Sequence, residues 1–367
     1  MKIFFLAGEH SGDLHASAVS NELKLQDSDV TLVGWGGDAM HNAGVVILRH
    51  FNTFQAIGIS SVIKQIFKFR SLFKECCRCI EEIKPDAVVL VDFAGFNLRI
   101  ARFAKKQGIK VVYYIPPKVW AWMPSRVKWL QKYVDLTLVI FPFEKDFLEQ
   151  HRVNTVYVGN PTLKSVEGYL PDNEFIKLYH ERKPIVFLPG SRPSEIKKMI
   201  PIISSLAEML AERKFLVAGI SNVEWALYDG IIGLSNVEVV FDRTFDLLHS
   251  SSVSIVTSGT ATLEAALLGA PQVVVYKTSA LNYFIARLLI KVEFISLVNL
   301  LLNRTLVSEL IQSSCTAERI GQEIERLESN EVMQKKISEG YSEIKDTLIF
   351  KNQSESAASA ILKLCRS

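Results

Sequence analysis

Short runs of apolar residues recur along the first half of the chain, each followed by a turn and by a segment long enough for a helix. Several runs are apolar at nearly every position, a pattern typical of strands buried on both faces of a parallel sheet. Strands that alternate with helices predict βαβ units. The strands predicted in this half are Lys2–Ala7, Val30–Val33, Ala87–Asp92, Lys110–Ile115, Asp135–Phe141 and Thr155–Val158.

The pattern begins again in the second half, after Gly159-Asn160-Pro161 and the mostly polar segment Glu167–Lys183. We therefore predict an α/β fold of two Rossmann-like, doubly wound domains that face an interdomain cleft. The predicted domains are residues 1–165 and 166–345, and it stays open whether the helical tail, residues 346–367, packs back on the first. The strands predicted in the second half are Pro184–Leu188, Phe215–Ala218, Val237–Phe241, Val253–Val256 and Gln272–Tyr276.

Composition narrows the class of protein. Of the 367 residues, 49% are hydrophobic and 22% charged, which allows a core in each half and excludes a disordered chain. The 42 Lys and Arg against 39 Asp and Glu give a net charge of +3, which argues against a dedicated nucleic-acid binder. The five cysteines lack disulfide-framework or metal-ligand spacing, so we expect free thiols in a reducing compartment. The first apolar run is too short for a signal peptide and no uncharged apolar window reaches about 18 residues, so we expect a cytoplasmic protein without a membrane span.

Residues that directly follow strands are the first candidates for chemistry, because open α/β sheets bind ligands outside the carboxyl ends of their strands. The first strand leads into Gly8-Glu9-His10-Ser11-Gly12-Asp13, where backbone amides and a helix N-terminus suit an anionic ligand. Asp92 ends another strand beside aromatic residues, where partial desolvation would raise its pKa and suit a general base. The alternatives are a tight turn with Asp13 near a helix cap, and a capping role for Asp92.

Two tryptophans follow the next predicted strand. Pro116 and Pro117 fix the backbone there, and Trp120 and Trp122 offer flat faces for a sugar or acyl group. A rigid loop packed by its own aromatic residues is the alternative.

Two loops of the second half suit phosphate. Gly190, Ser191 and Arg192 lie between a strand and a helix, so the guanidinium, a hydroxyl and backbone amides can meet phosphate oxygens. Ser258-Gly259-Thr260 leads into another helix, and Glu264 in its first turns can accept hydrogen bonds from ribose hydroxyls. A capping box explains the same spacing. Two such loops in one domain indicate a nucleotide, and without phosphate-loop or metal-ligand spacing we predict an enzyme that uses no metal and no cofactor.

The segment Phe54–Lys74 is amphipathic and contains no acidic residue. A basic amphipathic helix can lie in a bilayer interface, whereas most amphipathic helices face a protein core. The residues predicted to contact a membrane are Ile63, Ile66, Phe67, Phe69 and Phe73.

Taken in order, these motifs resemble those of the lipid-A-disaccharide synthase family, inverting glycosyltransferases of the two-Rossmann (GT-B) type. The resemblance extends from Ile3 to Leu301, and its motifs are specific as an ordered series. The matching segments are Gly8–Asp13, Asp92 with Phe96-Asn97, Val119–Trp122, Leu138–Lys145, Leu188–Arg192, Ser258–Glu264, and Tyr276 through Ser296–Leu301.

The resemblance implies UDP-2,3-diacylglucosamine as donor and 2,3-diacylglucosamine 1-phosphate as acceptor. The products would be a β-1′,6-linked disaccharide 1-phosphate and UDP. It implies that Asp92 is the base for the acceptor 6-hydroxyl, that Arg192 is the essential arginine at the leaving diphosphate, and that Glu264 contacts the nucleotide. The lipid-bearing substrates imply peripheral attachment to the inner membrane, and a homo-oligomer stays open. The expected nucleotide-binding residues are Gly190, Ser191, Arg192, Ser258, Gly259, Thr260, Glu264 and Asn299, and the expected acceptor-binding residues are Ser11, Gly12, Asp13, Trp120 and Trp122.

Several positions depart from the family pattern. Gly95 stands where many members carry a second acid, Ala94 and Val298 replace prolines, and Asn303 replaces a glycine. His10 is an unusual residue at its place and competes with Asp92 as the base. The alternative functions are another GT-B enzyme of UDP-amino-sugars, such as an epimerase, or an inactive GT-B scaffold that binds lipid-linked sugars.

Overall fold

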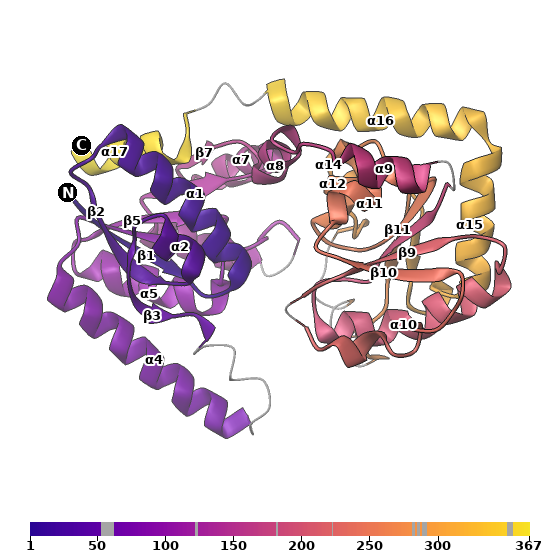
Figure 1. Cartoon of the computed structure of the whole chain (residues 1–367). Helices are drawn as coiled ribbons and strands as arrows, with labels where there is room; N and C mark the ends of the chain where they lie inside the picture. The colour runs from indigo at the N-terminus through magenta and orange to yellow at the C-terminus, as the bar shows by residue number, and fades with distance from the viewer. Residues whose placement is uncertain are drawn as a thin grey trace. The chain divides into compact units, whose positions relative to one another are not determined.

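The structure is a computed structural model that describes residues 1–52, 62–121, 124–180, 183–221, 223–280, 283–284, 287, 292–350 and 355–367. The chain divides into two compact units. Unit 1 comprises Met1–Asn160 and Ile349–Ser367, and unit 2 comprises Pro161–Leu348. Figure 1 labels the elements of both units.

Unit 1 contains a seven-stranded parallel sheet in the order β3-β2-β1-β4-β5-β6-β7. Successive residues of each central strand point to opposite faces, so Phe4 and Leu6 enter one core and Ile3 and Phe5 the other. The strands are β1 (Lys2–Ala7), β2 (Thr31–Gly36), β3 (Val46–His50), β4 (Ala87–Val91), β5 (Lys110–Tyr114), β6 (Leu136–Val139) and β7 (Thr155–Tyr157).

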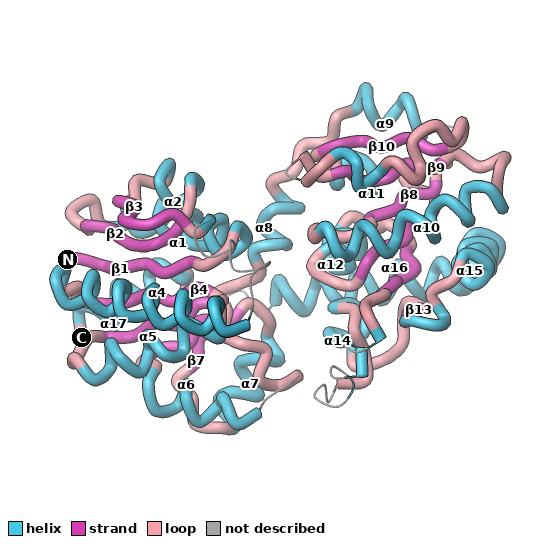
Figure 2. Tube along the Cα trace, turned by 90° about the horizontal axis from the view of Figure 1, so that it is seen from below, coloured by secondary structure: helices cyan, strands magenta, loops and turns pink. Residues whose placement is uncertain are grey.

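Helices cover both faces of this sheet, which explains why its strands are apolar at nearly every position. The core on one face includes α4 and α5, and the core on the other includes α1 and the C-terminal helix α17, which lies beside α1 (Figures 1 and 2). The helices of the unit are α1 (His10–Gln26), α2 (Asp38–Asn42), α4 (Val62–Ile83), α5 (Ala94–Lys106), α6 (Val127–Tyr133), α7 (Pro142–Gln150) and α17 (Ala357–Arg366).

Unit 2 contains a six-stranded parallel sheet in the order β10-β9-β8-β11-β12-β13. One core joins α9, α11 and α12 to this sheet, while α10 packs against α15. The strands are β8 (Ile185–Leu188), β9 (Phe215–Gly219), β10 (Val237–Phe241), β11 (Val253–Thr257), β12 (Gln272–Tyr276) and β13 (Glu309–Ile311). The helices are α8 (Pro161–Glu167), α9 (Asn173–His180), α10 (Pro193–Met209), α11 (Thr244–Ser250), α12 (Ala261–Leu267), α14 (Leu297–Leu302), α15 (Ala317–Ser329) and α16 (Glu331–Phe350).

The predicted fold class of two parallel-sheet α/β domains is confirmed. Every strand predicted from an apolar run is present, with bounds that differ by a few residues at most. Two short strands were not predicted. β3 is an edge strand with Val46 and Leu48 exposed, and β13 is only three residues long, so neither gives the continuous apolar signal of a buried strand.

Candidate functional site

Asp92 lies directly after β4 in a backbone conformation that few non-glycine residues adopt. Asp92 and Phe93 have φ angles of 46° and 45°, in the left-handed region. The carbonyl oxygen of Asp92 accepts hydrogen bonds from Asn97 Nδ2 at 2.8 Å and Tyr113 Oη at 2.7 Å, and its amide donates to the Tyr114 carbonyl. These bonds hold Asp92 in a strained conformation, and such strain is concentrated at functional sites.

The carboxyl group of Asp92 forms a pair with that of Glu9. β1 and β4 are neighbours with Ala7 opposite Val91, so the residues that follow them meet at one edge of the sheet. Burial raises the pKa of Asp92 from 3.8 to about 6, and the charge of Glu9 and a hydrogen bond with its carboxyl add to the rise. Glu9 Oε1 also accepts a hydrogen bond from Ser11 Oγ at 3.1 Å. A carboxyl with this pKa is ionised at neutral pH and remains basic enough to accept a proton.

The loop after β5 carries a lysine that acts on two carboxyl groups by its charge and a tryptophan that is bonded to α7. Lys118 lowers the pKa of both Asp92 and Glu144 by its charge, which places it near both carboxyls. Trp120 Nε1 donates to Glu144 Oε1 at 3.0 Å, and its ring packs edge-on against Phe143. Glu144 is 4% exposed, and burial raises its pKa to about 7 although the bond from Trp120 opposes the rise. Trp120 is therefore held in place and half-buried, whereas Trp122 lies outside the described residues.

Asp13 has a structural role in place of the predicted contact with an acceptor. Its side chain is 1% exposed, and its carboxylate accepts hydrogen bonds from the amides of Gly37, Ala39 and Met40 at 2.6, 3.0 and 3.2 Å. These amides belong to the start of α2, so Asp13 satisfies the helix N-terminus from a neighbouring element. Gly12 is buried as well, so of the three acceptor-binding residues predicted in this segment only Ser11 is exposed.

The loop after β8 caps the N-terminus of α10 and also presents the positively charged side chain of Arg192. The amides of Ser191 and Arg192 donate to Glu195 Oε2 at 3.1 and 3.3 Å, so these donors, predicted for phosphate, are already used. A Cβ at Gly190 would lie 2.5 Å from the same oxygen, which explains the glycine. The guanidinium of Arg192 contacts Glu195 Oε1 at 3.2 Å, yet the side chain is 71% exposed. Its remaining N–H groups, and the Ser191 hydroxyl, are available to a ligand.

The loop after β11 lies beside it, because β8 and β11 are paired. Ser258 is tied into the loop by bonds from its amide to Val275 O and from its hydroxyl to Ile295 O. Gly259 and Thr260 are exposed. The capping-box alternative is wrong here, because Thr260 makes no side-chain cap bond and Glu264 lies beyond the third helical position.

Glu264 is a partly buried acid at the start of α12. Burial raises its pKa to about 7. Within the part of the chain that the structure describes, no donor forms a hydrogen bond with its carboxyl group. This carboxyl therefore retains its full capacity to accept bonds from a ligand.

Asn299 was predicted to contact the nucleotide, and the structure assigns it to the core instead. The residue is fully buried. Its Nδ2 donates to Val307 O and Glu309 Oε1, both at 2.9 Å, and its Oδ1 accepts from the amides of Leu306 and Val307 at 2.8 and 3.0 Å. With both ends of the amide used, the side chain holds α14 to β13 and has no group left for a ligand.

The helix α4 turns part of its predicted membrane face to the core. Phe69 and Phe73 pack on the core of unit 1 and contact the ring of Phe96, with ring centroids 5.3 and 6.3 Å away. These two partly buried residues therefore pack toward the core, because the apolar arc is wide enough to cover both faces, and their contact with a membrane stays a prediction. Phe67 is 65% exposed, as predicted for a surface contact. The side chains of Ile63 and Ile66 lie outside the described residues.

Sequence reasoning missed two members of the Asp92 site. Glu9 and Lys118 both lie within quoted motifs, but their closeness to Asp92 depends on which strands are neighbours. His10, considered as a rival base, is exposed, and its ring centroid lies 6.4 Å from that of Phe51.

The described residues form neither a metal-binding cluster nor a membrane-spanning helix. They contain no group of three or more His, Cys, Asp or Glu side chains that could hold a metal ion. None of their helices combines the length and apolar character needed to cross a membrane.

Comparisons with known proteins assign the family. The family model described as lipid-A-disaccharide synthetase matches residues 3–363. A lipid-A-disaccharide synthase of Geobacter sulfurreducens is 35% identical over 373 residues, covering 99% of this chain and 97% of that protein. One of Syntrophus aciditrophicus is 33% identical over 374 residues, covering 99% and 98%.

Solved structures support the fold. A UDP-GlcNAc 2-epimerase from Neisseria meningitidis bound to UDP-GlcNAc has a TM-score of 0.66 at 13% identity and covers all of both chains. The glycosyltransferase of kitacinnamycin has a TM-score of 0.65 at 14% identity and covers 99% of this chain and 98% of that one. The TM-scores show that this chain has the two-domain GT-B fold, which epimerases share with glycosyltransferases. At identities this low the likeness shows the fold alone. On the full-length match of family model and relatives, the chain belongs to the lipid-A-disaccharide synthase family, the glycosyltransferases of lipid A biosynthesis.

Proposed function

We propose that this protein transfers a diacylglucosaminyl group from UDP-2,3-diacylglucosamine to the 6-hydroxyl of 2,3-diacylglucosamine 1-phosphate. The products are a β-1′,6-linked disaccharide 1-phosphate and UDP. In this proposal unit 1 binds the acceptor and unit 2 binds the donor. The observation that carries it is the Asp92 site, a strained and partly buried carboxyl with a pKa of about 6, in a chain of this family.

Asp92 acts as the general base in an inverting displacement. It takes the proton of the acceptor 6-hydroxyl while the hydroxyl oxygen attacks the anomeric carbon from the face opposite UDP. Glu9 is the positioning residue that raises the pKa of Asp92, and Lys118 limits the rise. Ser11, which is bonded to Glu9, and Trp120, which is bonded to Glu144, supply a hydroxyl and a flat face for the acceptor sugar.

The leaving diphosphate is held by unit 2. The exposed guanidinium of Arg192 and the exposed Gly259-Thr260 loop lie at the carboxyl ends of adjacent strands. A guanidinium pairs with two phosphate oxygens at once and stabilises the charge that develops on UDP. Glu264 accepts hydrogen bonds from the ribose hydroxyls, since its carboxyl has no donor among the described residues.

Lipid-linked substrates favour attachment to a membrane surface, and α4 supports it. Phe67 is exposed beside Lys68, Arg70 and Lys74 on a helix whose first turns contain no acidic residue. An exposed aromatic residue among cations binds anionic bilayers through apolar burial and charge together. Cosedimentation with vesicles of anionic lipid tests this. Phe67→Ser should weaken binding and Leu170→Ser, at an even more exposed leucine of unit 2, should not.

Mass spectrometry of the purified full chain with both lipid substrates, without added metal, tests the reaction. We expect the disaccharide 1-phosphate, and we expect Asp92→Asn to abolish it while UDP binding measured by calorimetry is retained. Asp29→Asn, at an exposed aspartate, is the matched control and should leave turnover unchanged. Full turnover of Asp92→Asn would show that Asp92 is not the base. UDP binding without any product in the wild-type protein would favour the scaffold alternative.

A further inference from the structure

Unit 2 contains a cavity of about 830 Å³ that the proposed reaction does not use. Its lining includes Lys183, two residues before β8, and Ser252 and Pro271, which immediately precede β11 and β12. The donor loops follow the carboxyl ends of β8 and β11, so the cavity lies at the opposite edge of the sheet. Five-residue β11 spans about 16 Å at a rise of about 3.3 Å per residue, so one ligand group cannot touch both edges.

One wall of the cavity is a polar stripe on α16. The helix packs on unit 2 through a buried apolar stripe, Ile337, Tyr341, Ile344 and Leu348. Two residues of this stripe, Ile337 and Tyr341, also line the cavity. The rest of the α16 wall is the polar stripe beside it, Gln334, Ser338, Ser342 and Lys345. Gln334 Nε2 already donates to Leu327 O and Glu328 O, and the Ser342 hydroxyl donates to Ser338 O. This stripe therefore offers a polar ligand the Lys345 ammonium group as a donor and hydroxyl oxygens as acceptors.

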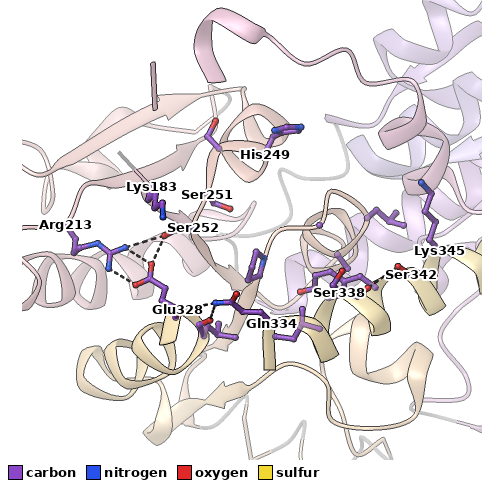
Figure 3. A pocket seen from close by; sticks show the side chains of 18 residues that line it. Lys183, Arg213, His249, Ser251, Ser252, Glu328, Gln334, Ser338, Ser342 and Lys345 are labelled. Carbon is purple, nitrogen blue, oxygen red and sulfur yellow. Dashed lines mark hydrogen bonds and ion pairs between the residues drawn. The ribbon is translucent and has the colours of Figure 1, made fainter. Parts of the chain in front are cut away.

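The charges of the cavity are unbalanced. Arg213 donates to both oxygens of Glu328 at 2.8 and 2.7 Å, so these two neutralise each other. Lys183 and Lys345 have no ion pair with any described residue, although Lys183 is near enough to favour the ionised form of Glu328. In Figure 3, Lys183, Arg213 and Glu328 lie at one end of the cavity and Lys345 at the other, next to Ser342. The described lining therefore carries a net excess of two positive charges.

The remaining lining combines apolar side chains such as Leu327 with helix ends and with serine hydroxyls, of which Ser250 and Ser251 already donate to backbone carbonyls and keep their oxygens as acceptors. Ser250 and Ser251 close the C-terminus of α11, and Leu267 and Gly269 lie at the end of α12. The C-terminal ends of helices carry partial negative charge, which suits hydroxyl donors and disfavours a bare anion. A ligand that satisfies both features has an anionic group for the lysines and hydroxyl groups for the serines and helix ends.

From this combination we propose that the cavity binds a small phosphorylated polyol or sugar, at a site separate from both substrates. The phosphate contacts Lys183 or Lys345, and the hydroxyl groups contact the serines and the C-terminal ends of α11 and α12. The volume lies within the range of small-molecule sites. Such a phosphate is either a free ester or the headgroup of a phospholipid, and the two sources share this chemistry.

Calorimetric titration of the full chain with glucose 6-phosphate, in saturating UDP, tests the proposal. We expect one site with a dissociation constant below about 1 mM, no binding of glucose, and weaker binding of inorganic phosphate. Lys183→Gln/Lys345→Gln should weaken binding at least about tenfold, because charge-assisted bonds are lost. Ser338→Leu should weaken it similarly by filling the cavity. Lys335→Gln, at an exposed lysine of α16 that does not line the cavity, should not.

Competition experiments distinguish a free phosphate ester from a phospholipid headgroup. Displacement of glucose 6-phosphate by glycerol 3-phosphate supports a free ester, and displacement only by short-chain phosphatidylglycerol supports a lipid headgroup. The proposal is overturned if glucose 6-phosphate shows no saturable binding. It is also overturned if the double variant and Ser338→Leu bind like the wild-type protein, or if inorganic phosphate binds as tightly as the sugar phosphate. Because the readout is binding in unit 2, it is independent of whether the disaccharide is formed.

Discussion

Replacing Asp92 by asparagine should make the protein more stable while it abolishes turnover. The pKa of Asp92 rises from 3.8 in the unfolded chain to about 6 in the folded one, mainly through burial. A difference of about two pKa units at about 1.4 kcal/mol each gives about 3 kcal/mol. With a folded pKa above the unfolded one, this contribution favours folding at low pH and is lost as the pH rises from about 4 to about 6. At pH 8 the wild-type protein therefore bears the full cost of a partly buried charge.

Asparagine has nearly the same shape and no charge to desolvate, so Asp92→Asn should recover part of this free energy. Because Glu9 shares the shift, we expect a gain of about 1–3 kcal/mol at pH 8 and almost none at pH 4. For a unit of this size that is a rise of about 2–10 °C in melting temperature, measurable by scanning calorimetry. Asp29→Asn serves as the control at both pH values. A variant that melts no higher than the wild-type protein at pH 8, or gains equally at pH 4, would contradict the account of Asp92 as a destabilised base.

Three further predictions follow from neighbouring contacts. Glu9→Gln removes the charge that raises the pKa of Asp92, so the acid limb of the profile of kcat/KM against pH should move to lower pH; an unmoved limb would exclude the coupling. Asp13→Ala leaves three amides of the α2 start without an acceptor and should cost about 2–4 kcal/mol of unfolding free energy, seen as a lower melting temperature with UDP affinity retained. Trp120→Phe removes the donor that opposes the raised pKa of Glu144, so this variant should lose more stability at pH 8 than at pH 5; equal losses would show that the bond does not depend on the charge of Glu144.

The fold was predictable because buried parallel strands leave a continuous apolar signal. β10 and β12 have the bounds expected from the sequence, Val237–Phe241 and Gln272–Tyr276. Asp92 was predictable for the same reason, since the end of an apolar strand marks the edge where ligands bind. The pairing of Glu9 with Asp92 was not, because it depends on β1 lying between β2 and β4, and strand order leaves no mark in local periodicity.

Other predictions were less reliable because one sequence pattern is compatible with two different structures. Phe67 and Phe69 both belong to the apolar arc of α4, and only the contact of Phe69 with Phe96 shows which one faces the core. A serine or threonine followed by glutamate predicts either a capping box or a ligand loop. The structure has the capping contact at Glu195, which the sequence analysis did not consider, and leaves Glu264 without the capping box that had stayed open for it.

The number of hydrogen-bond donors around a carboxyl group distinguishes structural acidic residues from functional ones. Asp13 accepts bonds from three backbone amides, and Glu309 accepts from two amides, a serine hydroxyl and the Asn299 amide group. Such carboxylates are fully occupied and stabilise the elements that supply the donors. Asp92 and Glu264 differ, because burial raises the pKa of each and neither is compensated by a comparable set of donors. A folded protein tolerates that cost where a substrate supplies the missing donor, the acceptor hydroxyl for Asp92 and the ribose hydroxyls for Glu264. By the same reasoning the side chain of Asn299, whose polar atoms are all used, is structural, although it lies in one of the segments that resemble the family.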